Sequence, residues 1–222
     1  MRKILFAVLL FTVAVCVIFA QNSSAETGVI RELSGEVELK VSGSDTFVVA
    51  KAGDVVALNT IVSTGFRSTA VIAVGSSVIT VRPLTRLSLA EIQSSSGTEN
   101  TNVALQTGRV RVEVTPPAGT RANFSVQSPS ATASVRGTSF DFDTVNLTVN
   151  EGTVSFSGIS GGPAAMVSIG SASFVGIDGE PANPVVVMDE ALLPSTPVGT
   201  PAAETVTQPA PSVVDLSITI GY

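Results

Sequence analysis

Polar and apolar residues alternate one by one along most of residues 28–177, which is the pattern of β-strands with one buried and one exposed face. In Arg109–Val114, valines fall on one side and charged residues on the other, and Glu36–Val41 repeats the arrangement. Two segments, Ala70–Val74 and Val78–Val81, are apolar on both faces, so we expect them to lie between two layers. No long stretch has helical periodicity. The pattern therefore predicts an all-β chain.

Glycines interrupt this alternation, often seven to twelve residues apart, and each allows a turn or a close approach of the backbone. Short strands with turns at such spacing are typical of a sandwich, a barrel or a solenoid. No strict sequence repeat is visible, so no regular solenoid code is assigned. The polar, Ser-rich stretch Gln93–Asn102 is interpreted as a long loop. We expect one β domain over residues 26–178, built as a β-solenoid or a twisted β-sandwich.

The N-terminus has the layout of a secretory signal. Arg2 and Lys3 precede an apolar run over residues 4–20, and a polar end with small residues at Ser23 and Ala25 follows. This predicts a signal peptide at residues 1–25, in helical form and cleaved before Glu26, and a periplasmic or extracellular location. The alternative is an uncleaved membrane anchor, which leaves the bulk of the chain on the same side.

The only cysteine, Cys16, lies inside this apolar run. Cleavage after residue 25 would leave a chain without thiols, which excludes disulfides and cysteine metal sites. Acylation of Cys16 is a less favoured alternative, because four more apolar residues follow it where the mature polar segment should begin.

The C-terminal part has a different composition. Seven of the twelve prolines lie between Pro181 and Pro211, and the chain has no Lys or Arg beyond Gly179. We interpret residues 179–211 as an extended, acidic, Pro-rich linker. Residues 212–222 return to alternation and are expected to form a strand-like segment, which could pair with the edge of its own sheet or with a partner. Its apolar side consists of Leu216, Ile218 and Ile220.

The residue types present leave little room for catalysis. There is no histidine, and the net charge of the chain without its first 25 residues is −8, which disfavours binding to nucleic acid or to an anionic membrane. Asp141 and Asp143 share one face of a predicted strand and could act as an acid and base pair or hold calcium. The simpler interpretation is a solvated strand face. We therefore expect no catalytic, cofactor-binding or metal-binding residues.

Arg109 and Arg111 are the candidate partner-binding residues. They share an outward strand face that could receive an acidic partner. The alternative is that they only keep this face soluble, since exposed arginines are common on protein surfaces.

Several segments, taken in order over about residues 28–158, resemble the periplasmic domain of the FecR family. The most specific are Val-Arg-Gly-Thr-x-Phe at 135–140 and Glu-Gly-x-Val at 151–154. Other matching segments begin at Gly35, Ala52, Asn59, Ser68 and Leu105. We interpret the matching residues as folding motifs, in which Thr64 and Thr138 bond nearby backbone and Arg136 braces carbonyls or Asp54. The structural motif comprises Gly53, Asp54, Thr64, Gly65, Arg136, Gly137, Thr138, Phe140, Glu151 and Gly152.

The resemblance implies a role in signal transduction across the inner membrane, in which a cytoplasmic segment controls a sigma factor. Only three residues precede the apolar run here, so we do not expect this chain to perform the sigma-factor step itself. The leading hypothesis is an exported, non-enzymatic FecR-like module that binds another envelope protein or polymer. The alternatives are a periplasmic sensor that acts through a separate membrane protein, and a glycan hydrolase that uses Asp141 and Asp143.

Overall fold

The computed structural model describes residues 27–187, and the regular secondary structure in this range is entirely β-strand. The eighteen strands form two sheets of nine strands each, so the predicted all-β class is confirmed. Within the described range, no helical segment has the length and hydrophobicity that a membrane crossing requires. The predicted signal peptide (residues 1–25) and the apolar positions Leu216, Ile218 and Ile220 lie outside the described residues.

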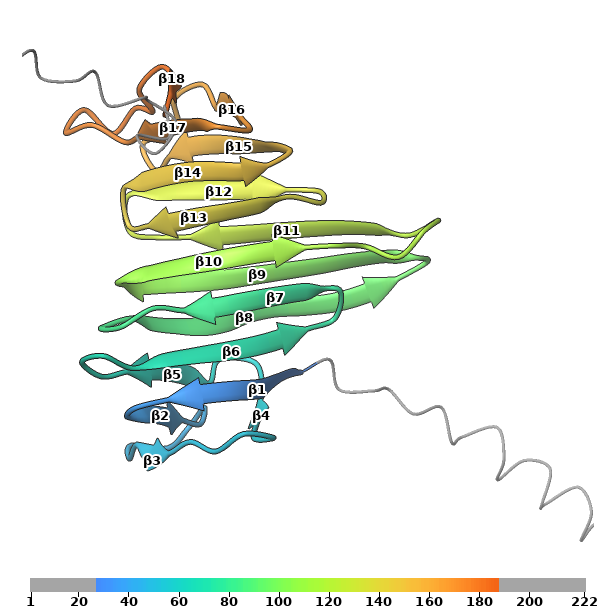
Figure 1. Ribbon diagram of the computed structural model, residues 1–222, viewed down its shortest axis with the longest axis vertical. Coiled ribbons are helices and arrows are strands. Elements are labelled where there is room, and N and C mark those ends of the chain that lie inside the picture. Colours follow the sequence, from blue (N-terminus) through green and yellow to red (C-terminus); the bar gives the residue numbers. More distant parts are fainter. Residues whose placement is uncertain (1–26, 188–222) are drawn as a thin grey trace, which may run out of the picture. The chain divides into compact units, whose positions relative to one another are not determined.

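The first sheet, here called sheet A, carries the charged strand Arg109–Val114 at its centre (Figure 1). Its strands in spatial order are β18 (Val185–Val186), β17 (Ser171–Phe174), β14 (Asn146–Glu151), β13 (Ser139–Asp143), β10 (Arg109–Val114), β7 (Ser77–Val81), β6 (Thr69–Val74), β1 (Gly28–Ser34) and β4 (Val55–Val56).

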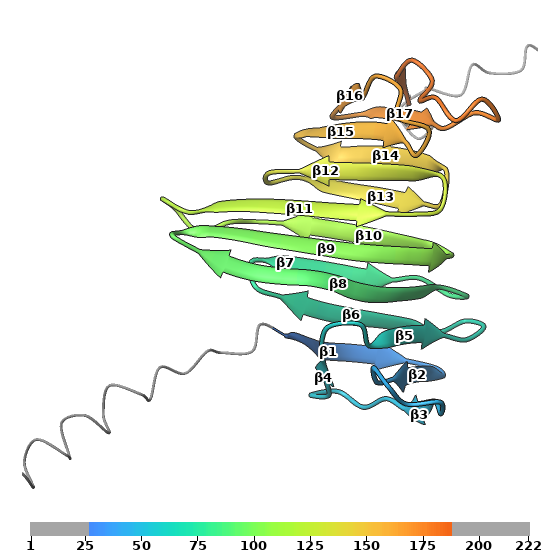
Figure 2. The ribbon, with the colours of Figure 1, turned by 180° about the vertical axis from the view of Figure 1, so that it is seen from behind.

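The second sheet, sheet B, is seen most clearly from the opposite side (Figure 2). Its strands in spatial order are β16 (Ala165–Ser168), β15 (Thr153–Gly158), β12 (Ala131–Val135), β11 (Arg121–Gln127), β9 (Thr98–Thr107), β8 (Arg86–Ser95), β5 (Ile61–Thr64), β2 (Val37–Lys40) and β3 (Val48–Val49). Strand β18 of sheet A falls in the segment that the sequence assigned to the linker.

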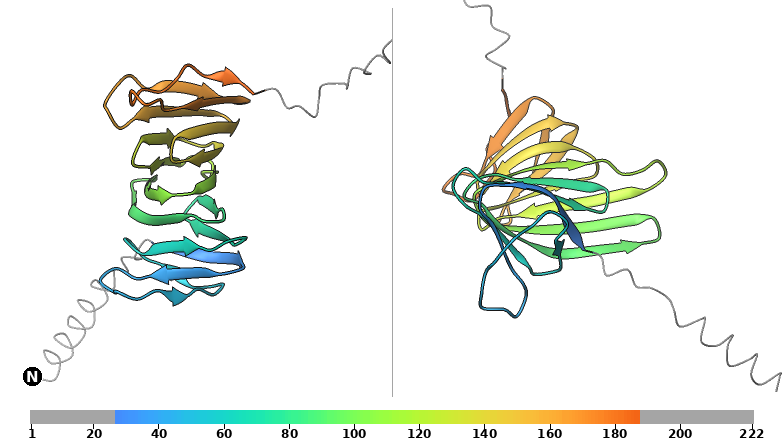
Figure 3. Two further views of the ribbon diagram at one scale, coloured as in Figure 1. Left: turned by 90° about the vertical axis from the view of Figure 1, so that its left-hand side faces the viewer. Right: turned by 60° about the horizontal axis from the view of Figure 1, so that its bottom comes forward.

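The chain advances along the two sheets together. From β5 onward, it places one strand or one hairpin in one sheet, crosses to the other sheet, and returns one step further along (Figure 3). Neighbouring strands are antiparallel except β9 and β11, which run parallel because β10 in the other sheet separates them along the chain. From β5 onward, strand positions follow the sequence to β16 and β18 at one end of the described unit, whereas at the other end β3 and β4 lie outside β2 and β1.

The inward faces of both sheets form one hydrophobic core. In β10 the burial alternates strictly, with Val110, Val112 and Val114 inside and the charged residues outside. Phe142 of sheet A meets Phe156 of sheet B edge to face, with ring centroids 6.0 Å apart, which is a favourable aromatic geometry. Alternation in the sequence thus decides which side chains hold the sheets together.

Two expectations about strands are corrected by the structure. The prediction of a long loop over Gln93–Asn102 is wrong, because β8 and β9 form an extended hairpin that turns at Ser96 and Gly97. The tip of this hairpin extends beyond the body of the sheets, so both of its faces can be polar while its backbone hydrogen bonds are kept (Figure 1). The second correction concerns the segments that are apolar on both faces.

Strands β6 and β7 do not lie between two layers of the described residues. Their inward residues are buried in the core, whereas the outward Val71, Ala73 and Val78 are partly exposed. Their outward faces are shielded only by neighbouring side chains, because the described unit has two sheets and no third layer. Apolar residues on both faces of a strand therefore do not require a covering layer here.

Candidate functional site

The outer face of sheet A carries a ladder of opposite charges, here called the charged ladder, formed by Arg82, Arg109, Arg111, Asp141 and Asp143. The register of β10 and β13 places Arg109 directly opposite Asp143 and Arg111 directly opposite Asp141. Because alternation turns the valines and phenylalanines inward, all four of these charged side chains project to the same outer face. Opposite charges that face one another across strands stabilise the pairing of the strands.

Asp141 is the centre of the stronger pair. Arg111 donates to it from Nε and Nη2, with distances to Oδ2 of 3.0 and 2.7 Å. Asn150 Nδ2 donates to the same oxygen at 2.9 Å, and Arg82 Nη2 lies 3.8 Å from Oδ1. The planar guanidinium suits a carboxylate held in this two-pronged way, so Arg111 and Asp141 restrain each other.

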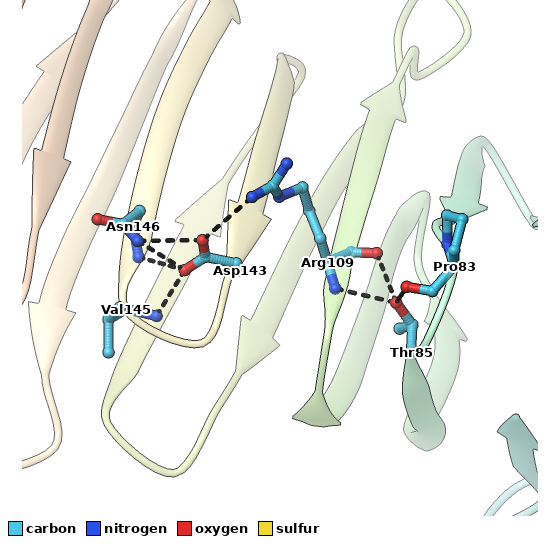
Figure 4. Close-up of polar contacts among 6 residues, drawn as sticks. All are labelled: Pro83, Thr85, Arg109, Asp143, Val145 and Asn146. Carbon is cyan, nitrogen blue, oxygen red and sulfur yellow. Dashed lines mark hydrogen bonds and ion pairs between the residues drawn. The ribbon is translucent and has the colours of Figure 1, made fainter. Parts of the chain in front are cut away.

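Asp143 combines an ion pair with the closure of a turn (Figure 4). Its Oδ1 accepts hydrogen bonds from the backbone N–H groups of Val145 and Asn146, at 2.9 and 2.7 Å. The amide of Asn146 also donates to this carboxylate, and Arg109 Nη2 lies 3.7 Å from Oδ2. The carboxylate therefore fixes the turn between β13 and β14 and holds Arg109 only loosely.

Both aspartates are ionised at neutral pH. Burial raises the pKa of Asp141, but the hydrogen bonds from Arg111 and Asn150 and the charges of Arg111 and Arg82 outweigh it, so the pKa lies below its usual value. Burial also raises the pKa of Asp143, and the donors of Val145 and Asn146 and the charge of Arg109 likewise bring the pKa below its usual value. Neither carboxyl is suited to act as a general acid at neutral pH.

Asp141 also changes the pKa of the Arg111 guanidinium. Its hydrogen bond to Asp141 raises its pKa above the usual arginine value, and the charge of Asp141 acts in the same direction.

Among residues 27–187 no group of three or more histidine, cysteine, aspartate or glutamate residues could hold a metal ion. Asp141 and Asp143 belong to no such group within the described residues.

A hollow of about 980 Å³ lies beside this ladder on the outer face. Arg109 lies at the hollow, and its side chain is 63% exposed, compared with 40% for Arg111. Thr85 holds the backbone of Arg109 in place, because its hydroxyl accepts from Arg109 N at 2.9 Å and donates to Arg109 O at 3.1 Å (Figure 4). The two predicted partner-binding arginines are thus brought together on one face, already paired with aspartates of the same chain.

The FecR-like motif residues are distributed over several turns and do not meet at one site. The expected hydrogen bonding of Thr64 to the backbone is confirmed. Its hydroxyl donates to Arg82 O at 2.6 Å and accepts from Thr85 N at 3.0 Å. Gly65 N donates to Glu36 O, and Asp54 accepts from Lys51 N at 2.7 Å, which closes the turn that contains Gly53. These residues fix turns between strands.

The remaining motif residues lie around the turn between β14 and β15. Phe140 is buried in the core, as expected. Gly152, which follows Glu151, has a φ of +72°, and a Cβ there would lie 2.6 Å from Thr138 Cγ2, so this position requires glycine. The prediction that the Thr138 hydroxyl bonds nearby backbone is wrong, since this buried oxygen has no partner among the described residues.

Arg136, which precedes Gly137, is not the brace that the sequence suggested. Its side chain is exposed and makes no hydrogen bond or ion pair with Asp54 or any other part of residues 27–187. It lines a hollow of about 650 Å³ on the outer face of sheet B. The sequence reasoning missed this hollow, because its residues come from six strands and part of β9 had been interpreted as a loop. The strands are β8, β9, β11, β12, β15 and β16. The available signal was the run of Asn, Ser and Thr at outward positions of these strands.

The comparison with family models agrees with the motif analysis. Residues 59–155 match the family model described as FecR protein. Two crystal structures of a "putative anti-sigma factor" from Parabacteroides distasonis ATCC 8503 are similar at 15% sequence identity, with TM-scores of 0.45 and 0.44. Each similarity covers 55% of this chain and 57% of the other, so the chain matches a little over half of their length. No curated protein matches the sequence.

The family match begins after Gly53 and Asp54 and ends after the Glu-Gly-x-Val motif, whose first residue is Glu151. It includes the charged ladder, the turn at Gly152 and most of the strands that line the sheet B hollow. The predicted resemblance is therefore confirmed over residues 59–155, which match the FecR family model.

Proposed function

We propose that this protein is an exported, non-enzymatic FecR-like module that binds another component of the cell envelope, through the outer face of sheet A. The observation that carries the proposal is the pair of arginines held in register beside a surface hollow. Arg111 is fixed by two hydrogen-bonding nitrogens, whereas Arg109 is 3.7 Å from its carboxylate and largely exposed. An acidic group of a partner can therefore compete for Arg109 while Arg111 keeps the face in order.

The arrangement of the strands supports a binding module better than an enzyme. Successive hairpins that alternate between two sheets are consistent with the solenoid form of the fold, which presents long, regular outer faces. Asp141 and Asp143 are ionised and paired with arginines, so they offer neither a protonated acid nor a free base. Arginines in a shaped hollow are typical of protein interfaces.

The FecR match favours a second candidate, a periplasmic sensor or regulatory component that acts through a separate membrane protein. Both candidates require location outside the cytoplasm, which the predicted signal peptide supports. They differ in the partner, which would be a membrane protein for the sensor and a structural protein or polymer for the module.

Site-specific photo-crosslinking in intact cells tests the proposal. A photoreactive residue replaces Arg109, and the matched control carries it at Arg121, an exposed arginine of sheet B outside the sheet A hollow. We expect a discrete adduct from position 109 that is absent from position 121. A membrane protein in the adduct would favour the sensor. Equal labelling at both positions, or no adduct from position 109, would refute binding at this face.

A further inference from the structure

The hollow on the outer face of sheet B has an ordered polar floor, here called the polar groove. It is about 650 Å³ in volume and spans six adjacent strands from β8 to β16. Its floor is dominated by amide and hydroxyl side chains at outward positions, namely Asn100, Asn102, Asn123, Ser125, Ser134 and Ser155.

The register of the strands sets these side chains in rows. Ser125 lies opposite Asn102 on one side and Ser134 on the other, and Ser134 lies opposite Ser155. Ser155 in turn lies opposite Met166 of β16. Each strand thus adds one side chain to a row that runs across the sheet, and the step is the strand spacing of about 4.8 Å. The row is longer than a single small molecule requires and suits a linear polymer.

Most of the hydrogen-bonding capacity of this row is unused within the protein. The structure gives one hydrogen bond among the groove side chains of residues 27–187, from Asn123 Nδ2 to Asn100 Oδ1 at 2.8 Å. Asn102 Oδ1 is buried and has no partner in the same range. Ser134 is exposed, and its hydroxyl bonds to no other described residue. Hydroxyl and amide groups can each both donate and accept, so they can bond a ligand that does the same.

The charge of the polar groove narrows the ligand class. Its lining contains one cation, Arg136, and one anion, Glu91, so it has no net charge to attract a polyanion or a polycation. At one end the row reaches Met166, which is 61% exposed and offers an apolar contact. Sugar rings carry hydroxyl groups at their edges and C–H groups on their faces. They therefore match a floor of hydroxyl and amide groups that ends in an apolar side chain.

We propose that the polar groove binds a linear, uncharged polysaccharide laid across the strands of sheet B. Each sugar ring spans roughly one strand spacing, so that successive rings meet successive side chains of the row. This site is on the other sheet from Arg109 and Arg111, and its ligand does not depend on the charged ladder. Its failure would leave the crosslinking proposal for Arg109 in place, and the reverse also holds.

Titration calorimetry with the protein lacking residues 1–25 tests the site. The probes are cellotetraose and fully N-acetylated chitotetraose, and polygalacturonate serves as an anionic comparison. Ser155→Trp fills the polar groove, while Ser157→Trp is its matched control, on the same strand, the same face and with similar exposure but outside the groove. We expect the wild type to bind at least one neutral probe, Ser155→Trp to weaken binding about tenfold or more, and Ser157→Trp to change it by less than about twofold.

Circular dichroism melting shows whether each variant is folded, and Ser134→Trp, at an exposed position of the groove, is the second variant if Ser155→Trp melts early. The proposal is wrong if the wild type binds neither neutral probe or binds only polygalacturonate. It is equally wrong if folded groove variants and Ser157→Trp bind with the same affinity, because the ligand would then lie elsewhere.

Discussion

Replacing Val112 by aspartate tests the assignment of inner and outer faces on which both proposed sites depend. Val112 is fully buried at the centre of sheet A, directly opposite Ile79 of β7 and Phe140 of β13, which are also fully buried. An aspartate at this position would place a carboxyl group in the apolar core between the sheets, and these two cross-strand neighbours carry no polar side-chain group to bond it.

The expected loss has two parts. Removing the buried valine side chain costs about 1.5–3 kcal/mol of hydrophobic stabilisation. Burying an ionised carboxylate without a partner costs several kcal/mol more, unless it takes up a proton. The sum, about 5 kcal/mol or more at neutral pH, is comparable to the whole free energy of unfolding of a typical domain, about 5–15 kcal/mol. We therefore expect Val112→Asp to be largely unfolded at pH 7.

Urea unfolding followed by circular dichroism measures the effect, since the chain has no tryptophan. Val112→Ala is the first control and should lose only about 1–3 kcal/mol, because it creates a cavity without a buried charge. Glu113→Gln is the second control, and as a neighbouring exposed residue it should stay within about 0.5 kcal/mol of the wild type. A wild-type unfolding midpoint for Val112→Asp would show that the alternation has been assigned to the wrong face and would remove the basis of both proposed sites.

Two further predictions concern the ion pair and one turn. The pKa of Asp141 is lowered in the folded state, so its ionised form adds stability above the unfolded pKa of about 3.9, and this stability is lost as the pH falls through the folded pKa. Asp141→Asn should therefore lower stability by about 1 kcal/mol or less at pH 7 and flatten the acid limb in thermal melts from pH 2 to 7, as expected of a partly exposed pair; an unchanged acid limb would show that the pair with Arg111 adds nothing. Gly152→Ala and Gly170→Ala each force a side chain on a backbone with φ +72°, but only at Gly152 would the new Cβ meet a neighbouring atom, Thr138 Cγ2 at 2.6 Å. Urea unfolding should show a loss of about 1 kcal/mol or more for both variants and a clearly larger loss for Gly152→Ala, whereas equal losses would mean that Thr138 moves aside freely.

The strand assignments came from local information and were mostly correct where one face of the strand is buried. The valines of β10 and the inward phenylalanines of β13 were identified because a half-buried strand must alternate. The same rule failed for the stretch Gln93–Asn102, since the tip of the β8–β9 hairpin extends past the core and no alternation is imposed on it. Alternation in a sequence arises because one face of a strand is buried. At the tip of this hairpin that cause was absent, although the backbone hydrogen bonds between the two strands remained.

The two site faces were predicted less completely than the strands. Arg109 and Arg111 were identified as candidates on one face, but their partners Asp143 and Asp141 lie about 30 residues further along the chain and were interpreted separately. The polar groove was missed, because no short segment contains more than two or three of its residues. Its rows exist only where six strands come into register.

By itself the sequence determined the class of the fold, the inward face of most strands, the FecR motifs and the lack of histidine chemistry. These features depend on residue type and on the spacing of residues close together in the chain, and both can be read directly from the sequence. Only the tertiary structure decided that each arginine of β10 faces an aspartate of β13, that Arg136 lies on sheet B away from Asp54, and that amide and hydroxyl groups of separate strands share one groove. The physical reason is that strand register depends on hydrogen bonds between residues far apart in the sequence, and a shift of one residue would turn every side chain of a strand to the opposite face.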